Sequence, residues 1–192
     1  MVKTKKSVMI CGFGGIGRSW LRAIRSHDDW ELTGIIDIDT EMLENIPSMV
    51  PELDEDQTYT QVEHVALFGE KPDLVILGTP IHTHSGLAQE VLDQGINVIC
   101  EKNMASNIPQ ARQMVQKALD HPELCTAVGT QYRYNMHNWT AKQFFKTGAY
   151  LDLIGQLGMM IWHDWGFRGE KRWGWRRFLP DVYLEDMSVH WF

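Results

Sequence analysis

The chain has 192 residues, of which 44% are hydrophobic and 22% are charged, and its formal net charge at pH 7 is -7. This composition is typical of a soluble globular protein with room for one full domain and part of another. The negative charge argues against a broad nucleic-acid surface, which needs clustered cations. No apolar run reaches the roughly 18 residues of a membrane helix.

The cysteines and the N-terminus predict a cytoplasmic protein. Cys11, Cys100 and Cys125 are odd in number and lie at or inside predicted strands, so we expect buried free thiols in a reducing compartment. The apolar run that follows the first lysines is too short for the core of a signal peptide. His163 and Asp164 have no companions at ligand spacing, so no metal site is expected.

The stretch from Val8 to Asp37 predicts a strand, a glycine-rich turn, a helix and a second strand. Gly12, Gly14 and Gly17 fit the pattern G-x-G-x-x-G, in which glycines allow a tight turn, approach of a pyrophosphate and close packing of the helix. The helix N-terminus then offers free N–H groups to phosphates. The residues of this stretch predicted to bind the cofactor are Gly12, Phe13, Gly14, Gly15, Ile16, Gly17 and Asp37.

Asp37 predicts which cofactor is bound. It ends the second strand, where a carboxylate accepts hydrogen bonds from the adenosine ribose hydroxyls and repels a 2′-phosphate. The next two residues, Ile38 and Asp39, offer no arginine to a phosphate. The sequence therefore favours NAD over NADP.

Further apolar strands and amphipathic helices alternate along the chain. Strands are expected over 74–77, 96–100 and 124–128, and helices over 16–26, 61–68, 85–94 and 107–120, with a short helix from 39 and an acidic loop over 47–57. In the first helix we expect Ile16, Leu21 and Ile24 to face the sheet. This alternation predicts an α/β fold with a doubly wound parallel Rossmann sheet. Ligands of such sheets bind at the carboxyl ends of the strands, where Gly12, Asp37, Thr79 and Lys102 would surround one crevice.

Beyond residue 128 the character of the chain changes. Six of the eight tryptophans lie there, and we expect a helix over 137–146, a strand over 154–162 and an irregular loop over 166–180. We therefore predict a cofactor-binding domain over 1–123 and a second domain over 124–192.

Four motifs in order resemble the Gfo/Idh/MocA family of NAD(P)-dependent oxidoreductases. They are G-T-P at 78–80 with His84, G-I-N-V-I-C-E-K at 95–102, Q-Y-R-Y at 131–134 and D-M-S-V-H at 186–190. The resemblance implies a Rossmann domain followed by an α+β substrate and oligomerisation domain. It implies hydride transfer between a nicotinamide cofactor and a small sugar, polyol or related hydroxyl compound.

The resemblance also implies roles for individual residues. His190 would be the acid/base, Asp186 would orient it, and Lys102 would place a cation beside the substrate oxygen. The nicotinamide and its ribose would contact Thr79, Pro80, His84, Glu101 and Lys102.

Several of these roles have alternatives. His84 could equally cap a helix, and Arg133 could form a structural salt bridge instead of meeting the substrate. Trp173 and Trp175 could stack on a polyol or belong to a core or interface. Two alternative functions also stay open: redox-neutral glycosidic cleavage with NAD recycled in place, and a non-catalytic NAD-binding or regulatory protein.

Two departures from the family pattern bear on these expectations. Asn103 stands where the family has proline after the Glu-Lys pair, and the chain ends at Phe192, whereas family members continue far beyond the D-x-x-x-H motif. We therefore expect an incomplete substrate domain, from a truncated product or a fragment. Unpaired strand edges would then lower stability or lead to an unusual association, with a homo-oligomer among the outcomes.

Overall fold

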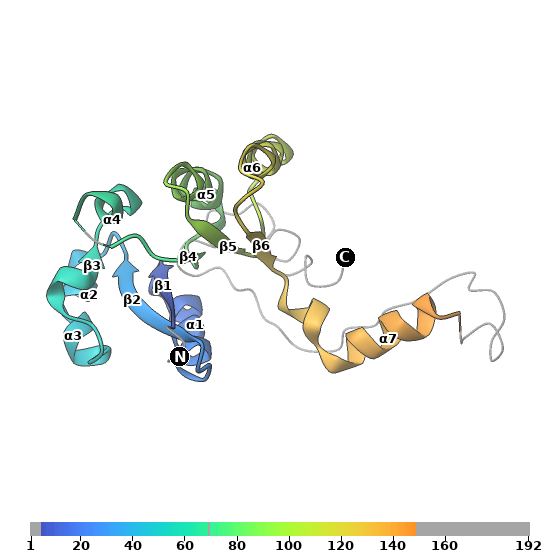
Figure 1. Ribbon diagram of the computed structural model, residues 1–192, viewed down its shortest axis with the longest axis horizontal. Coiled ribbons are helices and arrows are strands. Elements are labelled where there is room, and N and C mark those ends of the chain that lie inside the picture. Colours follow the sequence, from blue (N-terminus) through green and yellow to red (C-terminus); the bar gives the residue numbers. More distant parts are fainter. Residues whose placement is uncertain (1–4, 69, 149–192) are drawn as a thin grey trace, which may run out of the picture. The chain divides into compact units, whose positions relative to one another are not determined.

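The computed structural model describes residues 5–68 and 70–148 (Figure 1). The chain forms two compact units, Met1–Gly129 and Thr130–Phe192. The boundary expected after residue 123 lies before the last strand of the first unit, and the division falls after that strand. None of the helices in the described ranges is long and apolar enough to span a membrane.

The first unit is built on a six-stranded parallel sheet. Its strands lie in the order β3-β2-β1-β4-β5-β6, and every neighbouring pair runs parallel. They are β1 (Lys6–Cys11), β2 (Trp30–Ile36), β3 (Thr58–Tyr59), β4 (Leu74–Leu77), β5 (Asn97–Glu101) and β6 (Thr126–Gly129). The strand order reverses between β1 and β4, which is the switch point of a doubly wound fold. The predicted Rossmann sheet is confirmed.

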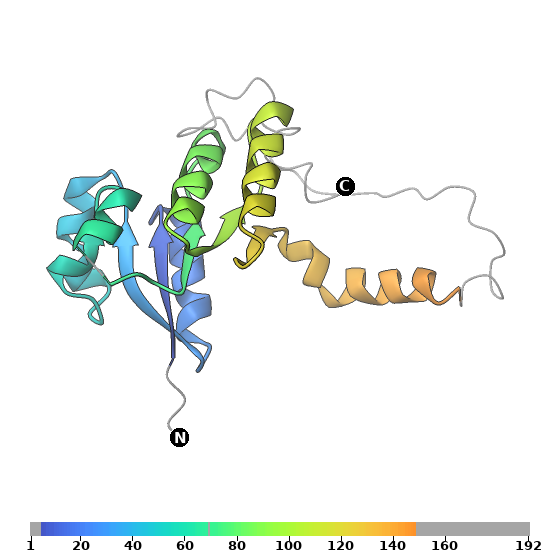
Figure 2. The same ribbon diagram turned by 45° about the horizontal axis from the view of Figure 1, so that its top comes forward.

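Helices cover both faces of the sheet. They are α1 (Gly15–Arg25), α2 (Thr40–Glu44), α3 (Ile46–Met49), α4 (Val62–Phe68), α5 (His84–Asp93) and α6 (Ile108–Asp120), with 3₁₀ turns η1 (Glu55–Gln57) and η2 (Ile81–Thr83). Figure 1 shows α4, α5 and α6 on one side of the strands and α1 on the other, and Figure 2 shows α5 beside α6.

Two apolar layers result from the alternation of side chains along each buried strand. Met9, Val75 and Val98 belong to the layer under α4, α5 and α6, whereas Ile10 and Ile76 belong to the layer under α1, α2 and α3. This explains why strands such as β4 read as continuous apolar runs: both of their faces are covered.

The first helix differs from its prediction in one side chain. Gly17, Leu21 and Ile24 are buried against the sheet, but Ile16 is 45% exposed. Successive helical residues turn by about 100°, so a face centred on 17, 21 and 24 excludes residue 16. The expectation that Ile16 faces the sheet was wrong.

The segment after α2 holds more structure than a loop. Asp39 accepts a hydrogen bond from Met42 N and begins α2, as expected. Residues 47–57 were expected as a loop, but they include the end of α3 and all of η1. They lead into β3, whose two residues are too few to show a period in the sequence.

The cysteine prediction is confirmed at two of three positions. Cys11 and Cys100 are buried, and burial raises the pKa of each thiol to about 12. Cys125 is exposed, contrary to expectation, because it directly precedes β6 at the edge of the sheet.

The described part of the second unit begins with the 3₁₀ turn η3 (Gln131–Tyr134) and α7 (Met136–Lys146). The predicted helix over 137–146 is confirmed. Within it, the ammonium group of Lys142 lies 5.8 Å from the centre of the Trp139 ring. The predicted strand over 154–162 and loop over 166–180 lie outside the described residues.

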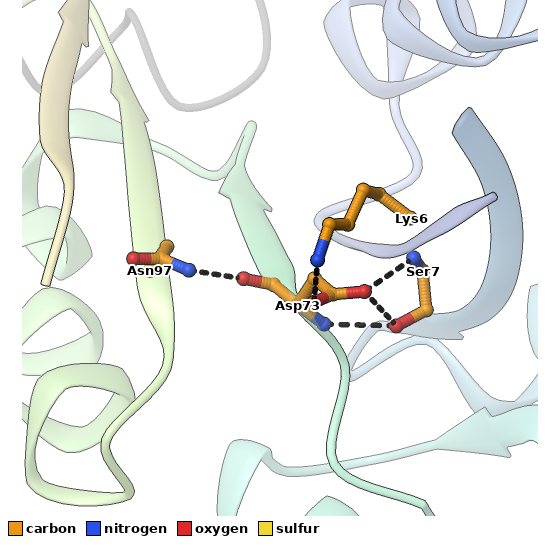
Figure 3. Close-up of polar contacts among 4 residues, drawn as sticks. All are labelled: Lys6, Ser7, Asp73 and Asn97. Carbon is orange, nitrogen blue, oxygen red and sulfur yellow. Dashed lines mark hydrogen bonds and ion pairs between the residues drawn. The ribbon is translucent and has the colours of Figure 1, made fainter. Parts of the chain in front are cut away.

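A polar network ties the amino ends of the strands together (Figure 3). Asp73 accepts hydrogen bonds from Lys6 Nζ at 3.1 Å and from the backbone N–H of Ser7 at 2.9 Å. The backbone N–H of Asp73 donates to Ser7 Oγ at 2.9 Å, and its carbonyl accepts from Asn97 Nδ2 at 2.6 Å. Asn97 Oδ1 accepts in turn from Cys125 N at 2.8 Å. The network therefore sets the register of β1, β4, β5 and β6.

We expect Asp73→Asn to lower the free energy of unfolding by about 1 kcal/mol, since it removes a charge-assisted acceptor that is partly exposed. The Ser7 N–H, and secondly Lys6, lower the pKa of Asp73. Its contribution is therefore present at neutral pH and is lost as the pH falls below the ordinary aspartate pKa of 3.8. Urea unfolding at several pH values measures this.

Asp28→Asn, on an exposed turn, is the matched control and should leave stability nearly unchanged. A difference between wild type and Asp73→Asn that persists unchanged below the ordinary pKa would contradict the assignment.

Candidate functional site

The glycine-rich turn joins the end of β1 to the start of α1. Gly12 has a φ of +90°, and a Cβ there would lie 2.8 Å from the backbone nitrogen of Thr79. A Cβ at Gly17 would overlap the carbonyl oxygen of Gly12. Hydrogen bonds from Gly12 N to Ile36 O (2.8 Å) and from Gly78 N to Cys11 O (2.7 Å) hold the turn against its neighbours. Gly12 and Gly17 are thus needed for the fold itself.

Gly14 and Gly15, unlike Gly12 and Gly17, have open space where a side chain would lie. Apart from the adjoining residues and the backbone of α1 itself, nothing lies within 4 Å of a Cβ built at either position. Gly14 caps α1 with φ -71° and ψ -158°, a conformation open to any residue, and the first turn of the helix contains no acidic residue. The approach to the N-terminus of α1 is therefore free, as binding of an anion there requires.

Asp37 lies beside this turn. Its Oδ2 accepts a hydrogen bond from the backbone N–H of Phe13 at 2.7 Å, and its Oδ1 accepts from Asp39 N at 3.1 Å. These bonds fix the carboxylate between the ends of β1 and β2. Each oxygen keeps a further lone pair, so the fixed carboxylate can still accept from a ribose hydroxyl.

His84 links the turns that follow β4 and β5. The side chain is 1% exposed, with Nδ1 at 2.7 Å from Asn103 O and Nε2 at 2.8 Å from Thr79 O. Burial lowers the pKa of His84, while the two carbonyl groups and Glu101 raise it and His82 lowers it further. Thr83 precedes the first turn of α5, and both ring nitrogens of His84 lie against carbonyl groups outside that helix, so the ring does not cap the N-terminus of α5. The side chain is a bridge between two loops.

Glu101 is the last residue of β5, and Lys102 follows it. The Oε1 of Glu101 accepts a hydrogen bond from the indole Nε1 of Trp20 at 2.9 Å, and its Oε2 accepts from Lys102 N at 3.2 Å. The peptide bond between Lys102 and Asn103 is cis. Lys102 is half-buried.

The first unit thus brings many of the predicted cofactor residues to one edge of the sheet. The turns after β1, β2, β4 and β5 carry Gly12 to Gly17, Asp37, Thr79 with Pro80, and Glu101 with Lys102. Arg133 lies in η3 of the second unit. The remaining candidates lie outside the described residues; they are Trp173, Trp175, Asp186 and His190.

Two residues at this edge were missed by the sequence analysis. The guanidinium of Arg18 lies 5.9 Å from the centre of the Phe13 ring, beside the glycine turn. Trp20 lies next to the buried face of α1, so the sequence predicts that it packs against the sheet. The sequence does not predict its hydrogen bond to Glu101, which lies 81 residues further along the chain. Across residues 5–68 and 70–148, no three metal-ligating side chains gather in a way that could hold a metal ion.

Comparison with known families identifies this architecture. Residues 6–130 match the profile described as the oxidoreductase family with an NAD-binding Rossmann fold. The chain belongs to the Gfo/Idh/MocA oxidoreductase family. The match spans all six strands, so the Gfo/Idh/MocA fold extends through β6. Comparison with curated proteins gives no significant match.

Solved structures of Gfo/Idh/MocA-like proteins share this fold. The WlbA dehydrogenase of Bordetella pertussis, solved with NADH and UDP-GlcNAcA, is 26% identical, with a TM-score of 0.69 over 76% of this chain and 43% of that one. The myo-inositol 2-dehydrogenase of Lactobacillus plantarum is 21% identical, with a TM-score of 0.67 over 76% and 42%. The scyllo-inositol dehydrogenase of Lactobacillus casei, solved with NAD(H) and scyllo-inositol, is 18% identical, with a TM-score of 0.69 over 76% and 42%. The chain thus spans less than half the length of these structures.

The contrast between the glycines gives a prediction. Gly14→Ala should fold with nearly wild-type stability, since its Cβ has open space, but should weaken NAD binding about tenfold or more by obstructing the pyrophosphate. Gly17→Ala should lower the free energy of unfolding by about 2 kcal/mol or more through its clash with Gly12 O. Thermal unfolding and calorimetric titration separate the two effects. Wild-type NAD affinity in Gly14→Ala would contradict the placement of the pyrophosphate.

His84 gives a prediction on pH. Burial holds its pKa below the ordinary value of 6.5, so its contribution to stability is present above that pH and is lost as the pH falls below it. Urea unfolding at pH about 7.5 and about 5.5 should show wild type losing more stability than His84→Gln. The control His27→Gln, on an exposed turn, should keep the wild-type dependence. Equal losses in wild type and His84→Gln would contradict the prediction.

Proposed function

We propose that the chain is an NAD-dependent oxidoreductase that transfers a hydride between the nicotinamide and a sugar, polyol or related hydroxyl compound. The observation that carries the proposal is the convergence of four turns at the carboxyl edge of the sheet. They present an open helix N-terminus at Gly14, a fixed carboxylate at Asp37, and the Glu101–Lys102 pair. These three features correspond to three parts of a dinucleotide. The helix N-terminus suits the pyrophosphate, the Asp37 carboxylate suits the adenosine ribose, and the Glu101–Lys102 pair suits the nicotinamide end.

NAD supplies the hydride acceptor or donor, and the residues of the chain bind, orient and move protons. The N–H groups at the start of α1 would hold the pyrophosphate, and Asp37 would accept from the adenosine ribose. Thr79, Pro80 and Glu101 would surround the nicotinamide riboside. Lys102 would favour negative charge developing on the substrate oxygen.

The proton acceptor is assigned by the family resemblance. His190 would take or return the proton of the substrate hydroxyl, and Asp186 would orient His190. Arg133, Trp173 and Trp175 would contribute to substrate binding. The proposal thus gives cofactor binding to the first unit and substrate contacts to the second.

The substrate class has support from the relatives. WlbA was solved with a nucleotide sugar, and the inositol dehydrogenases take their names from cyclic polyols. Sugars and cyclic polyols both carry several hydroxyl groups, so we infer a small hydroxyl-rich substrate for this chain. The acidic Asp37 favours NAD over NADP, and the free thiols of Cys11 and Cys100 suit a cytoplasmic location.

The test is a turnover assay of the full chain with NAD and a panel of sugars and polyols, following NADH formation. Lys102→Ala should lower kcat about 100-fold or more, since it removes a cation at the developing alkoxide. Lys71→Ala, exposed at the opposite edge of the sheet, should retain activity.

The outcomes separate the alternatives. NAD binding with no turnover of any compound, and no effect of Lys102→Ala, would favour a non-catalytic NAD-binding protein. Conversion of a glycoside without release of NADH would favour redox-neutral chemistry.

A further inference from the structure

The carboxylate of Glu101 is held by a tryptophan from the opposite end of the first unit's sequence. Trp20 lies on α1, and its indole Nε1 donates to Glu101 Oε1 at 2.9 Å. Both side chains are half-buried, and Trp20 packs against the apolar layer under α1. The contact connects the helix that begins at the glycine turn with the strand that carries the Glu-Lys pair.

The Glu101 carboxylate has two further neighbours, the backbone of Lys102 and that of Gly129. Its Oε2 accepts from Lys102 N at 3.2 Å. A Cβ at Gly129 of β6 would lie 3.0 Å from Oε1 and 3.2 Å from Cδ. The carboxylate thus occupies a niche formed by the Trp20 indole, the Lys102 amide and the bare backbone of Gly129.

The chemistry of these partners suits positioning. An indole N–H can only donate, so it bonds the ionised carboxylate and orients one of its oxygens. A glutamate side chain at a strand end otherwise has rotamer freedom, which costs binding free energy when a ligand must order it. A carboxylate already ordered by the protein avoids that cost.

We propose that Trp20 is a positioning residue that holds Glu101 in the orientation needed to bind the nicotinamide riboside half of NAD. This inference rests on the proposed function, in which Glu101 contacts the nicotinamide ribose. One helix then serves both halves of the cofactor: its N-terminus faces the pyrophosphate, and its sixth residue orients the carboxylate at the other half.

Trp20→Phe is the test variant, because it keeps an aromatic ring and removes the N–H. We expect it to weaken NAD binding about five- to tenfold, because NAD must then order a Glu101 side chain that the protein no longer holds. ADP lacks the nicotinamide riboside, so its affinity should not change. The matched control is Trp30→Phe, which alters a tryptophan of the same apolar layer at the start of β2 and should change neither affinity.

Two further variants distinguish positioning from a structural role. In a Glu101→Ala background, Trp20→Phe should cause no additional loss of NAD affinity, because its target is gone. Gly129→Ala should displace the carboxylate from the other side and weaken NAD binding while sparing ADP. This variant also tests the niche if Trp20→Phe fails to fold.

The inference is overturned if Trp20→Phe binds NAD like wild type, weakens NAD and ADP equally, or adds its full effect to that of Glu101→Ala. It is likewise overturned if Gly129→Ala leaves NAD affinity unchanged. Failure of the folded wild-type chain to bind either NAD or ADP is a different result, which would overturn the proposed function and the inference with it. Calorimetric titration of the full chain with both ligands gives all of these outcomes.

Discussion

The close contact between Gly12 and Gly17 is the constraint on which the rest of the structure depends. The carbonyl of Gly12 occupies the place where a Cβ of residue 17 would be, so the chain leaves β1 and enters α1 within a few residues. The same turn has a positive φ at Gly12 and approaches Thr79 at the end of β4. As a result α1 begins at the carboxyl edge of the sheet, with its N–H groups facing outward beside the switch point.

The two edges of the sheet have different tasks. At the amino edge, Asp73 and Asn97 form hydrogen bonds to neighbouring strands, and these bonds set the register of β1, β4, β5 and β6. At the carboxyl edge, the corresponding turns are linked through His84 and the Trp20–Glu101 bond, while the surface near Gly14 is left open. A register fixed at one edge is what brings the turns together at the other.

Local signals were enough to predict most of the first unit. The apolar runs of the strands were readable from the sequence, and in the structure the Asn107 cap of α6 and the positive φ of Gly95 after α5 likewise depend on residues close in the sequence. The glycine turn and Asp37 were likewise readable, because their spacing follows from a strand, a turn and one helix.

What the sequence could not reveal are contacts between distant segments. The bridge from His84 to Asn103 and the bond from Trp20 to Glu101 depend on the order of strands in the sheet, which no local pattern specifies. The exposure of Ile16 was misjudged because the buried face of α1 is centred on Gly17, a residue without a side chain to mark it. Strand β3 was missed because two residues show no periodicity.

The most direct test of the account is amide hydrogen exchange of the full chain with and without saturating NAD. We expect slower exchange at the carboxyl edge, in the segments 13–18, 37–39, 79–81 and 101–103, and no local change at the amino edge around Ser7, Asp73 and Asn97. Protection confined to other segments, or no protection in a folded chain saturated with NAD, would contradict the placement of the cofactor site.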